Sequence, residues 1–520
     1  MDGILKQMSR RKKILIVAGI VLGVAILIPV IRHYQLRFAV ANYVAELKAK
    51  GEPMDLAQVI PPPVPPEQNG VPFIQNALTN LPRSSVVWTN PPKAMQMILP
   101  GKAEIGWQRS NIIELRGLGI PDDTNTWEDL GWELAAAKSD FDNFQSLTNH
   151  PVLDFNLDYQ NLRLPHLGWL KESAQWLSAA ALYDLHQGNP RNACAYVRAM
   201  LAIVKGETDE RPAISQLVHI AIAAIGANAT WEILQNPNVS DDDLAQLQQD
   251  WQSLDFTKSL EQALKFERVE NLQEFAQTRK SSEKFNKLWG YYYAPDAPSR
   301  DQTFPLMFPQ QKRSLSLRKW DEIRWRWFWS YQDELRGLQA FQVVIDATHM
   351  TESNKAFQSV ESFANANLPQ LKQGQGSWDD LRNLFSQSAF GLNASRRKAT
   401  RIETARNAVV IAIALKRYEL RHHQLPATLE DLTPDLLQII PIDCMDGQPL
   451  RYRLNADGTF LLYSVGENGV DDDGDPSLQK NIKSSNFYWQ NDHALDWVWP
   501  QPATEDEIQA YYKKLSSKSN

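Results

Sequence analysis

The chain has little cysteine and lacks the short motifs that mark many enzyme sites. Its 520 residues include two cysteines, Cys194 and Cys444. Two cysteines cannot form a disulfide framework, so we expect two free, buried thiols, with a single disulfide as the alternative. The sequence contains no Gly-x-Ser-x-Gly, no zinc-type cysteine pair and no dinucleotide-binding fingerprint. These absences argue against the common hydrolase, zinc and dinucleotide enzymes.

Positive charge is scarce beyond the first few residues. The chain has 54 Lys and Arg against 61 Asp and Glu, a formal net charge of −7. Five basic residues and one acidic residue among 1–13 give that segment +4, which leaves −11 for the remainder. An acidic body argues against nucleic acid as a partner and against tight docking on anionic lipid. It is compatible with the binding of cations.

Charge is absent altogether from residues 14–31. A helix of this length spans about 27 Å, close to the thickness of a bilayer's hydrocarbon core. The basic cluster Arg10–Lys13 precedes it, and such clusters stay on the cytoplasmic side. We therefore expect a transmembrane signal anchor in a bacterial inner membrane, with the N-terminus cytoplasmic and the bulk periplasmic. A cleaved signal peptide is the alternative, although the flank after Ile31 lacks an Ala-x-Ala-like site.

Glycine and proline mark the end of this segment. The apolar pattern continues through 32–50 and stops at Gly51, which predicts a membrane anchor and extended helix over 1–50. Five prolines lie within 60–66, which predicts a semi-rigid, proline-rich linker over 51–69. This linker would be a stalk or the connection that ends a packed helix.

The largest part of the chain, 70–396, is expected to be an α-helical domain. Apolar residues recur at three- and four-residue steps from Leu164 to Trp251. Breaks at 188–190 and 209–212 divide this stretch into a helical-hairpin array. Ser240, followed by three aspartates, is a predicted helix N-cap. Further helices are expected over 256–278, 320–348 and 377–390.

The character of the sequence changes near residue 397. A long amphipathic helix over 397–421 precedes two short strands, 452–454 and 460–464, around an Asp-Gly turn. We expect a small α+β domain over 397–490 and a mobile polar tail over 491–520. The predicted fold class is mainly α, with an N-terminal transmembrane helix, a helical-hairpin array and this small C-terminal domain.

Four carboxylates lie within the five residues Asp471–Asp475. A calcium ion, which takes about six to eight oxygen ligands, would offset their mutual repulsion. The spacing of Asp471, Asp473 and Asp475 is similar to the start of an EF-hand, but Pro476 stands where that loop requires glycine. A calcium site and a solvated acidic turn are both consistent with these residues.

The stretch from 397 to 475 resembles the globular domain of the type II secretion major pseudopilin. The matching features are Pro441-Ile442-Asp443, a strand entry at 446–452, and Leu462-Tyr463-Ser464 before the acidic loop. The resemblance implies a pseudopilin-like α+β fold and a Ca2+ ion held by the Leu462 and Ser464 carbonyls with Asp471, Asp473 and Asp475. Two features depart from the family: Asn468 replaces an aspartate, and the anchor lacks the Gly-Phe-Thr-Leu-x-Glu processing site.

Residues 61–268 resemble uncharacterised membrane-anchored proteins of planctomycete-type bacteria. The similar stretches are 100–103, 153–159, 164–167 and 215–219. That group has no established activity to carry over, so the resemblance implies a membrane-anchored architecture and no particular reaction.

Two histidines are the strongest candidates for catalysis. His166 and His219 lie on separate predicted helices, and Asp154, Asp158 or Glu172 could complete a metal or acid–base site with them. Neither histidine has a His-x-x-x-His or Glu-x-x-His partner at ligand spacing. Structural histidines, hydrogen-bonded between helices, are the simpler interpretation, because an enzyme would need these groups to converge in one pocket.

Aromatic residues are concentrated at 320–331. Trp320, Ile323, Trp327 and Tyr331 fall at helical spacing, which predicts that this face is buried core. Residues left exposed, such as Trp325 or Trp329, would then form a surface for a protein partner.

The sequence thus favours a single-pass, membrane-anchored, extracytoplasmic binding or scaffold protein with a calcium-stabilised C-terminal domain over an enzyme. The membrane contact is expected at 14–31 and a protein contact near Trp325 and Trp329, with no nucleic acid. The alternatives are an extracytoplasmic hydrolase with a site in the helical domain, and an accessory component of a type II secretion or pilus-like system.

Overall fold

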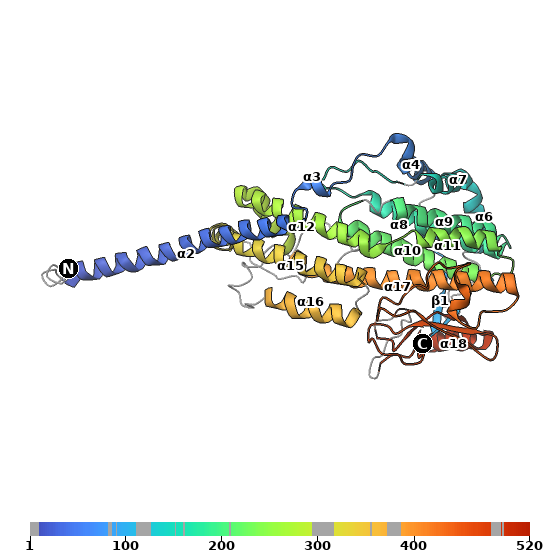
Figure 1. Cartoon of the computed structure of the whole chain (residues 1–520). Coiled ribbons are helices and arrows are strands. Elements are labelled where there is room, and N and C mark those ends of the chain that lie inside the picture. The colour runs from blue at the N-terminus through green and yellow to red at the C-terminus, as the bar shows by residue number, and fades with distance from the viewer. Residues whose placement is uncertain are drawn as a thin grey trace. The chain divides into compact units, whose positions relative to one another are not determined.

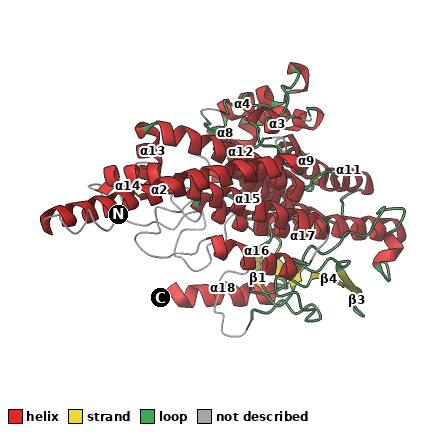
Figure 2. Cartoon of the chain, turned by 60° about the vertical axis from the view of Figure 1, so that its left-hand side comes forward, coloured by secondary structure: helices red, strands yellow, loops and turns green. Residues whose placement is uncertain are grey.

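The computed structural model of the chain is mainly helical, as predicted, and strands form a small part of it (Figure 2). It describes residues 10–81, 86–89, 91–110, 126–150, 152–159, 162–206, 210–293, 317–353, 356–371, 386–479, 490 and 493–519.

The chain divides into two compact units, each assembled from separate stretches. Unit 1 comprises Met1–Val59, Leu264–Asp346 and Ala364–Ala394, and unit 2 comprises Ile60–Ala263, Ala347–Phe363 and Ser395–Asn520. These units therefore do not follow the contiguous boundaries predicted from the sequence.

The first element of unit 1 is α2 (Arg10–Ala49), a continuous helix of 40 residues (Figure 1). Its length confirms the prediction that the helix continues well beyond the apolar run. It ends where predicted, because Gly51 adopts a φ of +83° and its N–H donates to the carbonyl of Lys48 at 3.0 Å. Only glycine adopts that backbone conformation without strain, so the residue terminates the helix.

The other helices of unit 1 contribute two apolar clusters. One joins the C-terminal half of α2 to the rest of unit 1 and contains Val40, Leu47, Met54 and Leu338. The other contains Phe275, Phe285, Trp289 and Trp325. The elements with residues in unit 1 are α12 (Phe256–Lys280), α13 (Ser282–Tyr293), α14 (Arg318–Arg324), the π-helical turn η5 (Trp325–Trp329), α15 (Ser330–Glu352), α16 (Phe357–Leu371) and α17 (Gln387–His422).

The first part of the predicted linker 51–69 packs in the folded protein. Met54 and Val59 are buried, and Met54 belongs to the apolar cluster with Leu338. Residues 51–59 therefore pack within unit 1, while the proline run begins directly at the first residues of unit 2. The short helices α3 (Leu56–Val59) and η1 (Pro66–Gln68) flank the prolines.

Unit 2 contains the predicted helical-hairpin array. Its helices α8 (His166–His186), α9 (Pro190–Gly206) and α10 (Ala213–Leu234) pack against one another, and α11 (Asp241–Gln252) packs on α9. The breaks at 188–190 and near 210–212 are confirmed, as is the N-cap, where Ser240 Oγ accepts the N–H of Asp243 at 3.1 Å. The array is preceded by α4 (Val71–Asn80), α5 (Val86–Thr89), η2 (Gly106–Gln108), α6 (Trp127–Ala136), α7 (Lys138–Ser146) and η3 (Leu147–Asn149).

Helix α10 is the one helix in the described part of the chain that is long and apolar enough to cross a membrane, and 67% of its apolar window is buried inside the protein. It is thus a core helix by its surroundings. The predicted span 14–31 belongs to α2, and several of its side chains lie outside the described residues.

Two small sheets complete unit 2. Strands β3 (Arg451–Leu454) and β4 (Phe460–Ser464) pair antiparallel and confirm the predicted hairpin, in which Leu454 is paired with Phe460. The second sheet has the order β1 (Gln96–Leu99), β2 (Lys102–Glu104) and β6 (Gln501–Pro502). The short helix η7 (Leu429–Leu432) precedes the hairpin.

The prediction of a mobile polar tail over 491–520 is wrong. β5 (Trp497–Val498) pairs with β4, and β6 pairs in parallel with β2. Trp497 and Trp499 are buried, and α18 (Glu505–Ser519) ends the described chain. Apolar residues at 497–499 outweigh the polar composition of the segment, because their burial stabilises the strand pairing.

Candidate functional site

One of the predicted histidines, His166, bonds to a buried carboxylate in unit 2, and the charge of that carboxylate also acts on the other, His219. His166 Nε2 lies 2.9 Å from Glu210 Oε2 and 3.2 Å from Oε1, and the Ser215 hydroxyl donates to Oε1. His219 is also buried, and burial lowers its pKa to about 4, while the negative charge of Glu210 acts in the opposite direction. The sequence reasoning missed Glu210, because it lies between the predicted helices in a stretch identified only as a break.

The connectivity of this network does not suit nucleophilic catalysis. In a catalytic triad the histidine lies between the nucleophile and the acid, so that it can remove the hydroxyl proton. Here Ser215 and His166 both bond directly to Glu210, and Phe155 stacks on the His166 ring at 4.1 Å. Each of these polar side chains is buried. The arrangement joins the start of α8 to the start of α10, which is a structural role.

The other residues predicted to accompany these histidines are not part of the hydrogen bonds just described. Asp154 Oδ1 accepts the N–H of Asn156, and the Asp154 carbonyl accepts a bond from Asn69. Burial, reinforced by the charge of Glu210, raises the pKa of the Tyr159 hydroxyl to about 12.

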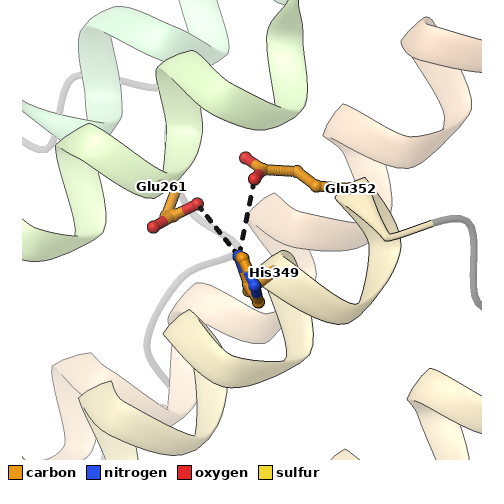
Figure 3. A group of neighbouring side chains, drawn as sticks. All are labelled: Glu261, His349 and Glu352. Carbon is orange, nitrogen blue, oxygen red and sulfur yellow. Dashed lines mark ion pairs between the residues drawn. The ribbon is translucent and has the colours of Figure 1, made fainter.

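A second group of potential ligands lies on the parts of α12 and α15 that belong to unit 2. His349 Nδ1 is 3.9 Å from Glu261 Oε2 and 3.7 Å from Glu352 Oε2, and Figure 3 shows both carboxylates beside the imidazole. Glu261 is nearly buried, but the His349 side chain is 69% exposed. The group offers three ligand atoms within 4.8 Å of one another. An exposed ion pair accounts for the same geometry, so we assign it no ion.

The predicted calcium ligands lie around one loop, but their side chains do not converge. Asp471 accepts the Tyr463 hydroxyl at 3.0 Å, and Asp473 is paired with Arg453 at 2.7 Å. Asp475 Oδ1 accepts the N–H of Ser477. Among the described residues the loop carboxylates form no group of three at ligand spacing. The Leu462 carbonyl accepts the N–H of Trp499, and the Ser464 hydroxyl donates to Asp443.

Asp496 is a carboxylate of this loop region that the sequence reasoning missed. Its Oδ2 accepts the N–H groups of Asp472 at 3.1 Å and Gly474 at 2.7 Å. Its Oδ1 is buried and has no hydrogen-bond partner in the described part of the chain. Burial, opposed by the Gly474 N–H and reinforced by the charges of Asp472 and Asp471, raises the pKa of Asp496 to about 6.

Two further residues of the predicted domain have structural roles. Asp443 is fully buried and accepts the N–H of Met445, the Ser464 hydroxyl and the N–H of Val465, each at 2.8–2.9 Å. It thus ties the Pro-Ile-Asp step to β4. Asn468 donates to Asp472 Oδ2 at 3.0 Å.

The predicted orientation of the aromatic segment is wrong. Trp325 is fully buried, and its indole N–H donates to Asp333 at 2.8 Å. Trp329 packs partly buried against the same cluster as Trp325. Trp320, Ile323 and Trp327 are exposed instead. Helical spacing identified residues that share a face, but spacing alone does not say whether that face is directed inward.

The thiols are free in unit 2, as expected. Burial raises the pKa of Cys194 to about 12, so this thiol is unreactive at neutral pH.

Comparison with protein-family models, with curated proteins and with solved structures finds no match to this chain.

Proposed function

We propose that this protein is a single-pass membrane protein whose bulk acts outside the cytoplasm as a binding or scaffold protein. The observation that carries the proposal is the exposure of α2. Large apolar side chains at many positions from Leu15 (69%) to Phe38 (71%) are exposed, with Leu36 partly buried, on a helix that continues far past them. An apolar helical surface of this length matches the hydrocarbon thickness of a bilayer.

The same helix changes its surroundings after Phe38. Val40 and Leu47 are buried in the cluster with Leu338, so the C-terminal half of α2 is part of the folded body. Such a helix fits a membrane anchor whose first half spans the bilayer and whose second half packs in the folded part of the protein. The basic residues 10–13 at its start favour a cytoplasmic N-terminus and a periplasmic bulk in a bacterial inner membrane.

Fractionation tests the anchor. The full chain is expected to stay in the membrane pellet through alkaline carbonate extraction, whereas a variant lacking residues 10–31 enters the soluble fraction. Release of the unaltered chain by carbonate would contradict the proposal.

Binding or scaffolding is favoured over hydrolysis because the buried histidine network has the connectivity of a structural brace. Glu210 receives both the Ser215 hydroxyl and the His166 imidazole. No residue of that network is then available as an activated nucleophile.

The proposal includes a calcium ion at the acidic loop of unit 2. Its support is the buried Oδ1 of Asp496 beside Asp471 and Asp472, which has no hydrogen-bond partner among the described residues. Buried carboxylate oxygens are normally paired or bind a metal, and oxygen ligands of this kind suit Ca2+. Asp496 would join the ligands implied by the pseudopilin resemblance, namely the Leu462 and Ser464 carbonyls with Asp471, Asp473 and Asp475.

Thermal unfolding of the full chain tests the ion. Excess Ca2+ should raise the midpoint temperature above that measured with chelator. At a hundredfold excess over Kd the gain in unfolding free energy is about 2.7 kcal/mol. Asp496→Asn should abolish that shift, and the control Asp435→Asn, at an exposed position of unit 2, should retain it. An equal midpoint with Ca2+ and with chelator in the unaltered chain would remove the site.

A further inference from the structure

Unit 1 carries an exposed aromatic face at the helical segment 317–328. Trp320 is 65% exposed and Trp327 63%, and Leu317, Ile323 and Phe328 are also exposed. We call Trp320, Ile323, Trp327 and Phe328 the aromatic face. Exposed tryptophans in such a group mark an interaction surface, because water contact with so much apolar surface is unfavourable.

The backbone holds this face outward. Trp325 is inserted between Phe275 and Phe285, with ring centroids 6.1 Å and 5.6 Å away, and its indole bonds to Asp333. The π-helical turn η5 contains Trp325, Trp327 and Phe328, and Tyr331, two residues past its end, packs with the cluster around Leu338. Trp325 therefore fixes the helix in unit 1 and leaves Trp327 and Phe328 on the solvent side.

The aromatic face adjoins α2 at one defined level. The Trp327 carbonyl lies 2.9 Å from His33 Nδ1, and the His33 ring contacts Tyr331 edge-on at 5.0 Å. His33 lies two residues beyond Ile31, the end of the uncharged run, which is about 3 Å along the helix axis. Each headgroup layer of a bilayer is about 5–7 Å thick. If residues 14–31 span the hydrocarbon core, Trp327 lies at the depth of the headgroups.

We infer that the aromatic face is a second membrane contact, seated in the headgroup layer on the side where α2 leaves the bilayer. This inference rests on the proposed anchor. Tryptophan is the residue enriched at that level of membrane proteins, where its ring is partly apolar and its N–H remains hydrated. The face would then hold unit 1 on the membrane surface and limit its tilt about the anchor.

The charges beside the face indicate what kind of lipid contact it makes. Arg324 pairs with Asp321 at 2.7 Å, and Arg326 pairs with Glu322 at 2.8 Å. These guanidinium groups are already neutralised by carboxylates of the same helix. Arg318 and Lys319 next to Trp320 add positive charge. Docking therefore rests on aromatic partitioning, which zwitterionic lipid supports, and anionic lipid should strengthen it.

Spin-label accessibility in nanodiscs tests the inference on the full chain. In a Cys194→Ala, Cys444→Ala background, a nitroxide is placed singly by Ile323→Cys on the face, by Val21→Cys within the apolar run, or by Trp132→Cys. Trp132 is 72% exposed on α6 of unit 2 and is the water-exposed reference. Oxygen, which partitions into lipid, and a water-soluble nickel chelate report the surroundings of each label.

We expect a ratio of oxygen to nickel collisions at Ile323 that is several-fold above that at Trp132 and below that at Val21. The pair Trp320→Ala and Trp327→Ala should lower the ratio at Ile323 and leave that at Val21 unchanged. Phosphatidylcholine discs should give this pattern, and discs containing phosphatidylglycerol should give a ratio at Ile323 that is at least as high.

The other outcomes overturn the inference in distinguishable ways. A lipid-like Val21 with a water-like Ile323 removes the aromatic contact and leaves the anchor intact. A water-like Val21 removes both. An Ile323 label shielded from both reagents shows that protein, such as a second copy of this chain, covers the face.

Discussion

Two long helices of this protein, α2 and α10, place their apolar side chains in opposite surroundings. In α10 most of the apolar window is buried against α8 and α9. In α2 most of the described apolar side chains from Leu15 to Phe38 are exposed, and Leu36 is partly buried. Length and composition alone would name α10 as a membrane span, so its burial by neighbouring helices decides that it is core.

The difference also appears in the polar groups that each helix tolerates. The last turn of α10 carries the fully buried Glu232, which accepts the N–H groups of Met95 and Gly106 at 2.6–2.9 Å. The uncharged run of α2 has no such group. A buried carboxylate survives in a protein core because backbone donors surround it, whereas lipid offers no donors.

A matched pair of charge insertions is the strongest way to break the comparison. Ile222→Asp places an unpaired charge at a fully buried position of α10 and should cost more than about 4 kcal/mol in unfolding free energy. Ile20→Asp in α2 should leave the urea midpoint in detergent unchanged. It should instead oppose membrane insertion by about 2.5–3.5 kcal/mol, read as a larger carbonate-soluble fraction. A loss of folded stability from Ile20→Asp equal to that from Ile222→Asp would show that α2 is ordinary core.

Two tryptophans of η5 extend the comparison to unit 1. Trp325→Ala should destabilise the protein by about 3–5 kcal/mol, because it empties a fully buried site and leaves Asp333 without one partner. Trp327→Ala, two residues away and exposed, should change stability by less than about 0.5 kcal/mol in detergent. Equal losses in chemical unfolding would place Trp327 in the core and contradict the exposed aromatic face.

The pH dependence of unfolding gives a smaller effect at α10. Burial raises the pKa of Glu232 to about 7, although backbone N–H groups and Arg109 oppose the rise. The folded state therefore binds the proton more tightly, and the resulting stability is present below pH 4.5 and lost as the pH rises toward 7. Relative to Glu232→Gln, the unaltered chain should lose up to about 3 kcal/mol over that window. Urea unfolding at several pH values measures this, with Glu128→Gln, exposed on α6, as the control that keeps the slope.

The sequence predicted best where a local signal determines the structure. Four features were predicted because the residue responsible acts on backbone within a few residues of itself. They are the turns near Gly188 and Pro212, the Ser240 cap and the end of α2 at Gly51. The hairpin around Gly458 belongs to the same class.

Features that depend on distant contacts were missed. Glu210 and Asp496 gain their surroundings from segments far away in the chain, so no local spacing indicated them. Trp320, Ile323 and Trp327 had the predicted spacing and the opposite direction, because the cluster around Phe275 and Phe285 buries Trp325 instead. The C-terminal strands were taken for a tail because their partners are as distant as β2.

The most direct test of the account is protease treatment of intact spheroplasts that carry the full chain with an epitope at each end. We predict that protease added outside removes the C-terminal epitope and leaves the N-terminal epitope within a membrane-bound fragment. Protection of the C-terminal epitope, or recovery of the whole chain in the soluble fraction, would contradict a membrane-anchored protein whose bulk lies outside the cytoplasm.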